Sequence, residues 1–304
     1  MSPVALDPPS ASLPEPQSGK VDDFDPGKVQ TGAKSMNFPA PPVWPNTEEG
    51  KLAERKHKLE RLAGAFRIAG KLGYDEGISG HFTLRDPILT DCFWVNPLGL
   101  AFSLVCVSDL LLINPQGDII AGGKPNRQLE EQIYNAAAYE IHHAVHTARP
   151  DVHAACHAHS LYGKAWSAFG RKLDTYVQDA CAFHNDLAVY PSFGGVVLSG
   201  GEGAKIAEHL GSCKAVLMQN HGQLTVAGTI DAAIAWYIFL DRLCHVQLLI
   251  EAAKADGKGP QPVLIGEEEA TWTRSVTGTE NAGWNGAQMY YDTIDAETGG
   301  SYKL

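Results

Sequence analysis

The hydrophobic pattern between residues 46 and 255 changes its period several times. Segments 46–70 and 230–254 have apolar residues at helical spacing, whereas 81–87 and 214–228 hold short apolar runs bounded by turn residues. The first pattern predicts helices and the second predicts strands. Because helices and strands are mixed without strict alternation, we predict a single α/β domain over 46–255, in which helices flank a central mixed or antiparallel sheet (an α/β/α arrangement).

Start and stop signals give the expected bounds of individual elements. Capping residues at 46–49 and glycines at 70–73 delimit a first helix, and a second runs from about Asn135 to Thr147, before Arg149-Pro150. The long helix at 230–254 closes the domain. Strands are expected at 151–159, 173–180, 194–198, 214–220 and 223–228, with short helices at 161–170 and 201–211.

Both ends of the sequence differ from the middle. Residues 1–45 are rich in Pro, Ser, Asp and Gly, a composition that buries too little apolar surface to offset chain entropy. We therefore expect this segment to be disordered or draped over the surface. Residues 256–304 are turn-rich but hold Trp272, Trp284, Tyr290 and Tyr291, so we expect an extended tail that packs on the core or on a neighbouring subunit.

Charge and cysteine usage limit the classes of partner. The formal net charge of -11 disfavours nucleic acid, which needs a basic face, and also disfavours anionic membranes. No run approaches the roughly 18–20 apolar residues of a transmembrane helix, and the N-terminus lacks the pattern of a signal peptide. The six cysteines form no C-x-x-C pair, so we expect reduced thiols and a cytoplasmic protein.

Three of the twelve histidines have the spacing of metal ligands. His157 and His159 are two apart at the end of an apparent strand, so both imidazoles can face one ion. His221 lies at a tight turn between two apolar strands, where the backbone is fixed. Three neutral ligands with open positions are typical of a catalytic zinc site. The alternative from spacing alone is a set of half-buried histidines that bond to carbonyl groups.

Four ordered segments resemble the class II aldolase/adducin family. They are GISGHFTLRDP (77–87), VNPLGLAFSLVCVSDLLLINPQG (95–117), HAACHAHSLYGKAWSAFG (153–170) and VLMQNHGQLTVAG (216–228). The stretch around the second helix, NAAAYEIHHAVHTARPDVHAACHAHS, is similar to the adducin-like branch of that family. The resemblance covers about residues 50–250.

The resemblance implies a single α/β/α domain that is often assembled as a cyclic tetramer. Metal-dependent members hold zinc or another divalent ion with the H-x-H pair and the N-H-G histidine, which in this chain are His157, His159 and His221. Zn²⁺ is therefore the expected cofactor, with Mn²⁺, Co²⁺ or Mg²⁺ as alternatives. Adducins are actin-cytoskeletal proteins whose head domain has lost metal ligands, so the retained histidines place this chain nearer the enzymes.

The sequence departs from the sugar-phosphate aldolases of this family at their catalytic carboxylate. Those enzymes carry an S-S-E segment where this chain has Ala136-Ala137-Ala138, so Ala138 stands in place of the glutamate. Glu140 is about 200° round the helix from that position and cannot simply substitute. Glu130 and Glu131 precede the helix and either reach into the site or form a solvated charge pair.

The glycine-rich segment also differs, because His81 follows Gly80 where the aldolases have asparagine. Backbone N–H groups of such a loop can hold an anion. We therefore interpret Gly77, Ser79, Gly80 and His81 as substrate- or anion-binding residues. His81 makes a phosphorylated substrate doubtful; it either binds a carboxylate or is structural. Asn96 and Gly99, from the V-N-P-L-G segment, complete this set.

A metal site without the glutamate suits decarboxylation better than retro-aldol cleavage, which needs a base. For proton transfer we select Asp179 and His184, clustered after the predicted strand at 173–180, and Tyr139, beside the vacant carboxylate position. The predicted function is a divalent-metal-dependent lyase that forms a metal-stabilised enolate from a small hydroxy or keto acid or carbonyl compound. The alternatives are an adducin-like partner of actin and, third, an epimerase. We expect a homo-oligomer, with a tetramer favoured.

Overall fold

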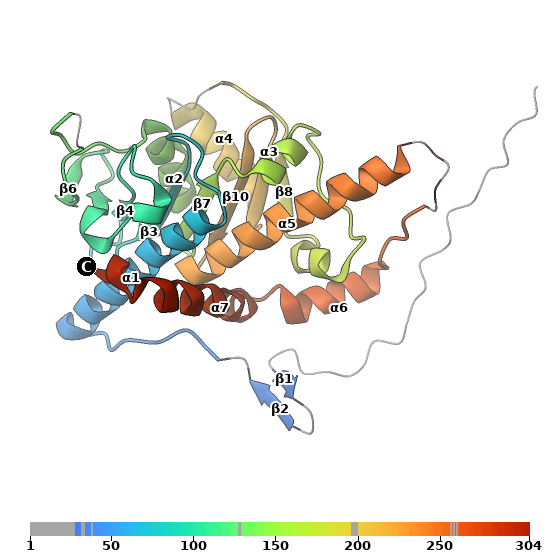
Figure 1. The fold of residues 1–304 in the computed structure, drawn as a ribbon, viewed down its shortest axis with the longest axis horizontal. Helices are drawn as coiled ribbons and strands as arrows, with labels where there is room; N and C mark the ends of the chain where they lie inside the picture. Colours follow the sequence, from blue (N-terminus) through green and yellow to red (C-terminus); the bar gives the residue numbers. More distant parts are fainter. Residues whose placement is uncertain are drawn as a thin grey trace, which may run out of the picture.

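An eight-stranded sheet forms the centre of the structure, a computed structural model (Figure 1). The strand order is β6-β5-β4-β3-β7-β10-β9-β8, and neighbouring strands pair antiparallel except β8 and β9, which are parallel. The predicted mixed sheet is therefore confirmed. The strands are β3 (His81–Arg85), β4 (Phe93–Val95), β5 (Leu111–Ile113), β6 (Ile119–Gly122), β7 (Ala154–Ala158), β8 (Leu187–Tyr190), β9 (Ala215–Met218) and β10 (Gly222–Ala227).

The structure describes residues 28–31, 34–37, 39–126, 129–195, 200–255, 257, 259 and 261–304, with the first two ranges and residue 200 as backbone only. Near the N-terminus, β1 (Lys28–Thr31) and β2 (Lys34–Asn37) form a separate antiparallel hairpin. The other residues of 1–38, for which disorder or a surface position is expected, lie outside the described residues. From Pro39 the chain runs beside the C-terminal part, where Asn285 donates a hydrogen bond to the Pro39 oxygen (2.8 Å).

Most helices begin where side-chain caps in the sequence predict them. Thr47 accepts a hydrogen bond from the Gly50 amide (3.1 Å), and Asn135 and Thr229 cap two further helices in the same way. The predicted bounds of the three longest helices of the domain are therefore confirmed to within a few residues. The helices are α1 (Glu48–Lys71), α2 (Ala136–Ala148), α3 (Leu161–Ser167), α4 (Gly200–Leu210), α5 (Ile230–Lys254), α6 (Glu267–Thr277) and α7 (Glu280–Thr298).

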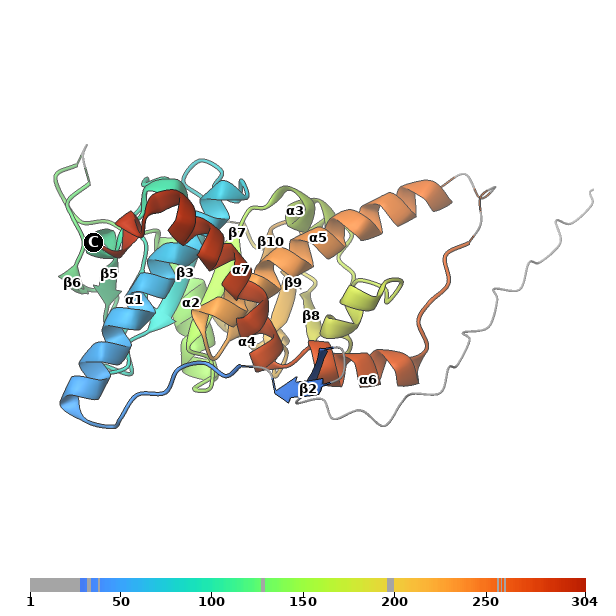
Figure 2. The same cartoon turned by 60° about the horizontal axis from the view of Figure 1, so that its bottom comes forward.

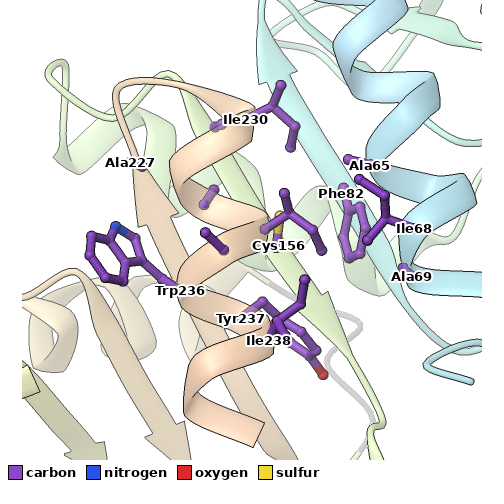
Figure 3. Close-up of a cluster of buried hydrophobic side chains, with 14 of the residues drawn as sticks. Ala65, Ile68, Ala69, Phe82, Cys156, Ala227, Ile230, Trp236, Tyr237 and Ile238 are labelled. Carbon is purple, nitrogen blue, oxygen red and sulfur yellow. The ribbon is translucent and has the colours of Figure 1, made fainter. Parts of the chain in front are cut away.

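Helices cover both faces of the sheet, and alternation along the strands divides the side chains between them. On one face, Phe82 of β3 and Cys156 of β7 pack with Ile68 of α1 and Tyr237 of α5 (Figure 3). On the other face, apolar residues of α2 and α4 pack against β7, β9 and β10. His81 of β3 is one step along the strand from Phe82 and therefore faces α2.

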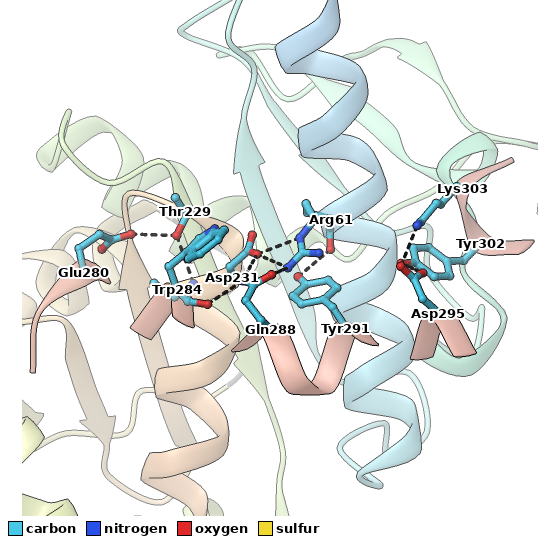
Figure 4. Close-up of polar contacts among 11 residues, drawn as sticks. Arg61, Thr229, Asp231, Glu280, Trp284, Gln288, Tyr291, Asp295, Tyr302 and Lys303 are labelled. Carbon is cyan, nitrogen blue, oxygen red and sulfur yellow. Dashed lines mark hydrogen bonds and ion pairs between the residues drawn. The ribbon is translucent and has the colours of Figure 1, made fainter. Parts of the chain in front are cut away.

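The C-terminal segment is not the extended tail that the sequence suggested, because it forms α6 and α7. Figure 2 shows α7 lying across α1 and α5. Its glycines, which resemble turn residues in the sequence, allow close packing: a Cβ atom on Gly283 would lie 2.6 Å from the Trp236 ring. Figure 4 shows the polar contacts, in which Arg61 pairs with Asp231, and Gln288 and Tyr291 of α7 contact Arg61.

Two predicted strands have other outcomes. Residues 173–180 form no strand; residues 178–183 form a 3-10 helix, Gln178–Phe183, with four consecutive buried residues and contacts to α6. Consecutive burial is incompatible with a strand that has one buried face. The strand instead lies at 187–190. Of the predicted strand 194–198, residues 196–198 lie outside the described residues, and Gly194 and Gly195 are not in a strand.

One helix, α5, is long and apolar enough to cross a membrane by length and composition alone. The prediction that no segment is apolar enough for a transmembrane helix is therefore wrong for residues 230–254. However, 61% of its most apolar window is buried within the structure, and the core helix of a soluble protein passes the same test. Its position against β7, β10 and α7 accounts for the composition, so the helix is weak support for a membrane span.

Candidate metal centre

His157, His159 and His221 meet where the C-terminal end of β7 lies beside the N-terminal end of β10. His157 is the penultimate residue of β7 and is paired with Leu224 of β10, while His159 follows the end of β7. His221 lies in the turn from β9 to β10, where Asn220 adopts a left-handed φ of 58° that asparagine tolerates. The turn between antiparallel strands therefore returns His221 to the end of β7.

The three imidazoles enclose a space suited to one ion. Their ring centroids are 4.7 Å apart for His157 and His221, 5.1 Å for His159 and His221, and 5.2 Å for His157 and His159. One nitrogen from each ring can be chosen so that all three lie within 4.8 Å of one another. This is the only such group of three or more His, Cys, Asp or Glu side chains among the described residues.

The tautomer of His157 is fixed by the backbone. Its Nδ1 lies 2.9 Å from the main-chain oxygen of Gln223, an atom that only accepts hydrogen bonds, so Nδ1 carries the proton. The unprotonated Nε2 is then the metal-ligating nitrogen. A carbonyl group that holds the second nitrogen of a ligand histidine is a common feature of metal sites, so the donor set fits a divalent ion.

Burial keeps these ligands uncharged. His157 is only 1% exposed, and burial, followed by the neighbouring His221, holds its pKa well below the ordinary value. Burial likewise lowers the pKa of His221 to about 4, and it lowers the pKa of His159 with a smaller contribution from Lys164. Neutral imidazoles are the form that binds metal, so the ligands need lose no proton at neutral pH.

A cavity of about 680 Å³ lies over the histidines. Ile78, Ile141 and Phe193 give it an apolar part, and Ser79 and Asn220 add polar groups. Among the described residues that line it, Lys164 is the single lysine or arginine, and none is aspartate or glutamate. Lys164 forms an ion pair with Glu76, whose pKa is lowered first of all by that hydrogen bond. Sequence patterns missed Lys164, Asn220 and Phe193.

The predicted glycine-loop residues divide into two groups. Ser79, Gly80 and His81 line the cavity, whereas Gly77, Asn96 and Gly99 are not among the lining residues. Gly80 has a φ of 100°, and a Cβ atom there would lie 2.9 Å from the Phe102 ring, so the position requires glycine.

Asn96 is buried beneath this loop. Its Nδ2 is 3.5 Å from the Gly80 oxygen, a weak contact, and its Oδ1 has no hydrogen-bond partner among the described residues.

The predicted proton-transfer residues lie away from the cavity lining in the described chain. Asp179 is exposed on the 3-10 helix, and His184 contacts Glu267 of α6 (2.9 Å). Their assignment to a strand end was wrong, because the predicted strand does not form. Tyr139 donates to the Pro115 oxygen (2.7 Å) and stacks on His143. The geometry of one chain therefore gives these three residues no contact with the metal centre.

The alanine run at the start of α2 lies beside the cavity. Ala137 lines it, while Ala138, the residue matched to the missing glutamate, is fully buried and is not in the lining. Neither Glu130, Glu131 nor Glu140 is among the described lining residues. A replacement carboxylate on this side is therefore absent from the cavity wall that the structure describes.

Two proteins that are similar to this chain have the names of enzymes. The decarboxylase NovR of Streptomyces niveus is 40% identical over 256 residues, which are 84% of this chain and 88% of that protein. A 4-hydroxy-3-prenylphenylpyruvate oxygenase/4-hydroxy-3-prenylbenzoate synthase of Streptomyces roseochromogenus subsp. oscitans is 39% identical over 256 residues, covering 84% of this chain and 86% of that protein.

A solved structure has the same fold as this chain. L-fuculose 1-phosphate aldolase from Glaciozyma antarctica PI12 is 44% identical, superposes with a TM-score of 0.74, and matches 85% of this chain and 96% of that chain. Decarboxylases and aldolases are lyases, so these relatives support a lyase enzyme. Residues 60–248 match the family described as Class II Aldolase and Adducin N-terminal domain. The ordered motifs, the mixed sheet and these matches agree: the chain belongs to the class II aldolase and adducin family.

Proposed function

We propose that this chain is a divalent-metal-dependent lyase that releases carbon dioxide from a small hydroxy or keto acid. The observation that carries the proposal is the set of groups around the cavity. Three neutral imidazoles converge there and one lysine is present, but none of the described lining residues is a carboxylate. Such a cavity has a place for a metal and for an anionic substrate, but no carboxylate base.

The donor set favours some ions over others. Three imidazoles suit Zn²⁺, and also Co²⁺ or Fe²⁺, better than Mg²⁺ or Mn²⁺, which prefer oxygen ligands. We propose Zn²⁺ as the first candidate. When bound, a divalent ion supplies a Lewis acid and an electron sink for the carbonyl group of a substrate.

Lys164 supplies the positive charge for the acid group of the substrate. It lies on α3, five residues after His159 along the chain, and it lines the same cavity. Its ion pair with Glu76 is partly exposed, with 35% and 61% of the two side chains accessible, so an incoming carboxylate can compete for the ammonium group. A carboxylate bound at Lys164 lies beside the three histidines. One small substrate can therefore contact both Lys164 and the metal centre.

The missing carboxylate distinguishes between the two lyase reactions of the relatives. Retro-aldol cleavage starts with removal of a hydroxyl proton, for which the lining offers no carboxylate. Decarboxylation of a 3-keto acid or an ortho-hydroxy aryl acid breaks the bond to the carboxylate carbon, moves the electron pair onto the conjugated oxygen as an enolate or phenolate, and needs a proton only afterwards. Decarboxylation, the reaction in the name of one relative, therefore suits this cavity better than the aldol reaction in the name of the other.

A second candidate reaction is oxidative. One relative of 39% identity is named as an oxygenase that acts on an aryl keto acid, 4-hydroxy-3-prenylphenylpyruvate. This name favours a 2-keto acid as the substrate of the oxidative reaction, whereas simple decarboxylation to an enolate requires a 3-keto or ortho-hydroxy aryl acid. Consumption of molecular oxygen distinguishes the oxidative from the simple decarboxylation.

The surroundings of the cavity support an assembly of several subunits. Ile78 and Phe193, which line the cavity, are 64% and 54% exposed, and the nearby Phe169 is 57% exposed. Large apolar groups at the edge of a site are suited to contact with a second subunit. We propose a homo-oligomer, with a tetramer favoured, in the cytoplasm. An adducin-like protein that binds actin is the alternative function.

A turnover screen tests the proposal. Purified protein is incubated with a series of 2-hydroxy, 2-keto and 3-keto acids, with and without chelator, while carbon dioxide, aldehyde and oxygen are measured. We expect chelator-sensitive carbon dioxide release, lost in His221→Ala and weakened in Lys164→Met. Aldehyde release without carbon dioxide contradicts the decarboxylase proposal and favours an aldolase. A protein that contains no divalent ion and turns over none of the acids favours the adducin-like alternative.

A further inference from the structure

A row of buried polar side chains connects the cavity with the interior. It alternates between β3, which contributes His81 and Thr83, and α2, which contributes His142 and His146. His81 Nδ1 is 3.0 Å from His142 Nε2, and His142 Nδ1 is 2.6 Å from Thr83 Oγ1. Thr83 Oγ1 is 2.8 Å from His146 Nε2, and His146 Nδ1 is 3.2 Å from the Val152 oxygen.

The last acceptor fixes the direction of every hydrogen bond in this row. The Val152 carbonyl oxygen only accepts, so His146 Nδ1 donates and a neutral His146 accepts at Nε2. Thr83 must then donate to His146. Its hydroxyl has one proton, and it therefore accepts from His142 Nδ1. His142 Nε2 is left as an acceptor, and His81 Nδ1–H donates a hydrogen bond to it.

The row therefore leaves His81 with an unprotonated Nε2. That argument requires neutral rings, and burial provides this: His81, His142 and His146 are 3%, 0% and 4% exposed. Burial lowers the pKa of His146, the ring that sets the direction of the row, to about 3. The Nδ1 atom of His81 is already hydrogen-bonded to His142, so Nε2 is the ring nitrogen that is free to contact a molecule in the cavity.

His81 stands next to the metal centre without being part of it. It is the direct cross-strand neighbour of His157, and their ring centroids are 5.0 Å apart. It does not, however, belong to the group of three whose nitrogens lie within 4.8 Å of one another. A substrate bound beside the three histidines thus meets a lone pair at this wall of the cavity, and a lone pair attracts hydrogen-bond donors and repels anionic oxygens.

We propose that His81 is a specificity-determining residue that accepts a hydrogen bond from a hydroxyl group of the substrate through Nε2, with its tautomer set by the row that ends at Val152. This inference rests on the proposed function, because it takes the cavity as the site of a small acid. The acid group then belongs at Lys164 and the hydroxyl group at His81. It also replaces the expectation that His81 binds a carboxylate, since an acceptor cannot bind one.

Nitrogen NMR tests the row without any substrate. In ¹⁵N-histidine-labelled protein, we expect His81, His142 and His146 all as neutral Nδ1–H tautomers. Thr83→Val removes the hydroxyl in the middle of the row, so His142 and His81 can reverse and Nε2–H signal appears for His81. Thr83→Ser keeps the hydroxyl and should keep the original tautomers. A wild-type His81 that carries its proton on Nε2, or a His81 tautomer unaffected by Thr83→Val, overturns the proposal.

Binding of three matched probes tests the specificity. Mandelate, its O-methyl ether and phenylacetate share a carboxylate and a ring, but only mandelate donates a hydroxyl hydrogen bond. We expect the wild-type protein to bind mandelate roughly 5- to 50-fold more tightly than the other two, as for one hydrogen bond to a buried acceptor. His81→Phe should reduce this preference at least several-fold, while any preference due to the metal alone persists in that variant.

The outcomes separate the two proposals. If all three probes bind and the preference for mandelate is the same in the wild-type protein and His81→Phe, His81 does not determine specificity and the proposed function stands. If none of the probes binds and the turnover screen fails, the proposed function is wrong; the tautomer of His81 then decides by itself whether the hydrogen bonds of the row run from His81 toward Val152.

Discussion

His157 and Gln223 are joined across two paired strands by a hydrogen bond of 2.9 Å from an imidazole Nδ1 to a main-chain oxygen. The bond links the metal centre to the sheet itself, because Gln223 belongs to β10 and His157 to β7. The ligand nitrogen of His157 is thus positioned by backbone atoms, whereas His159 and His221 are only half-buried and lie outside the strands.

The first prediction concerns metal binding. Alanine at His157, His159 or His221 should remove most of the bound divalent ion, because two imidazoles remain. Metal content per chain by mass spectrometry and a thermal shift on adding chelator measure the effect. An ion at a hundred times its Kd stabilises the folded chain by about 2.7 kcal/mol, so chelator should lower the Tm of the wild-type protein and leave that of the variants unchanged.

His209→Ala is the matched control for these variants. His209 is exposed on α4 and contacts the Lys205 oxygen of its own helix (2.8 Å). Its removal should change neither metal content nor the response to chelator. Equal metal loss in this control, or full metal retention in His221→Ala, would contradict the three-histidine site.

The second prediction concerns the start of α2, where the carboxylate is absent. Ala138 is fully buried, so Ala138→Glu places an unpaired charge in the interior and should destabilise the fold by roughly 3–5 kcal/mol. Ala137 lines the cavity, and Ala137→Glu should be tolerated but should weaken mandelate binding by placing a negative charge near the acid group. Thermal denaturation and calorimetry measure the two effects, and an Ala138→Glu protein as stable as the wild type would contradict the burial of this helix face.

The site shows which parts of a function sequence patterns can give. Two-residue spacing places His157 and His159 on one strand face, and a turn between apolar strands places His221 near them. The sequence could not predict that His81 lies on the same face of the sheet as these residues, or that α2 covers that face. Lys164 was missed for a similar reason: its distance from His159 along the chain does not tell which way α3 leaves the strand.

The fold was easier to predict in its centre than at its ends. Caps such as Thr47 and Asn135 act locally, so the helices they begin could be recognised from a few residues. The C-terminal helices depend on tertiary contacts instead. Gly283 weakens a helix in isolation but allows close contact with Trp236, and that compensation is visible only once α5 and α7 are packed together.

The third prediction concerns the attachment of α7. Arg61 of α1 and Asp231 of α5 form an ion pair with 16% and 5% of their side chains exposed, and Arg61 also lies 3.3 Å from the centroid of the Tyr291 ring. Asp231→Ala removes the only carboxylate that pairs with the buried Arg61 guanidinium in the described residues, leaving Gln288 as its side-chain acceptor, and should destabilise the protein by about 3–5 kcal/mol. The double variant Arg61→Met, Asp231→Leu should recover much of this loss.

Glu297→Ala provides the comparison for that pair. Lys71 and Glu297 also connect α1 with α7, but 45% and 50% of their side chains are exposed, so the loss should stay below about 1 kcal/mol. Thermal denaturation at one protein concentration compares the variants, since assembly would otherwise shift the Tm. Equal effects of Asp231→Ala and Glu297→Ala would mean that burial does not determine the contribution of the Arg61 pair.

The fourth prediction concerns acid stability and follows from His146. Burial, with a smaller effect of Arg85, lowers the pKa of His146 from 6.5 to about 3. Between these values the unfolded chain binds a proton that the folded chain does not, so the free energy of unfolding falls as the pH falls. One proton corresponds to about 1.4 kcal/mol per pH unit. The contribution is fully present above pH 6.5 and is lost progressively toward pH 3.

His146→Gln isolates this contribution, because glutamine keeps hydrogen-bonding groups but does not titrate. Urea unfolding at pH 7.5, 6.0 and 5.0 should show a steeper loss of stability for the wild-type protein than for the variant, by up to about 1.4 kcal/mol per pH unit below 6.5. His81 and His142 are buried in both proteins, so the difference between the two profiles reports His146 together with its smaller lowering effect on the pKa of His142. Parallel pH profiles would mean that His146 is protonated in the folded chain, and the row from Val152 to His81 would then lack the neutral ring on which its direction depends.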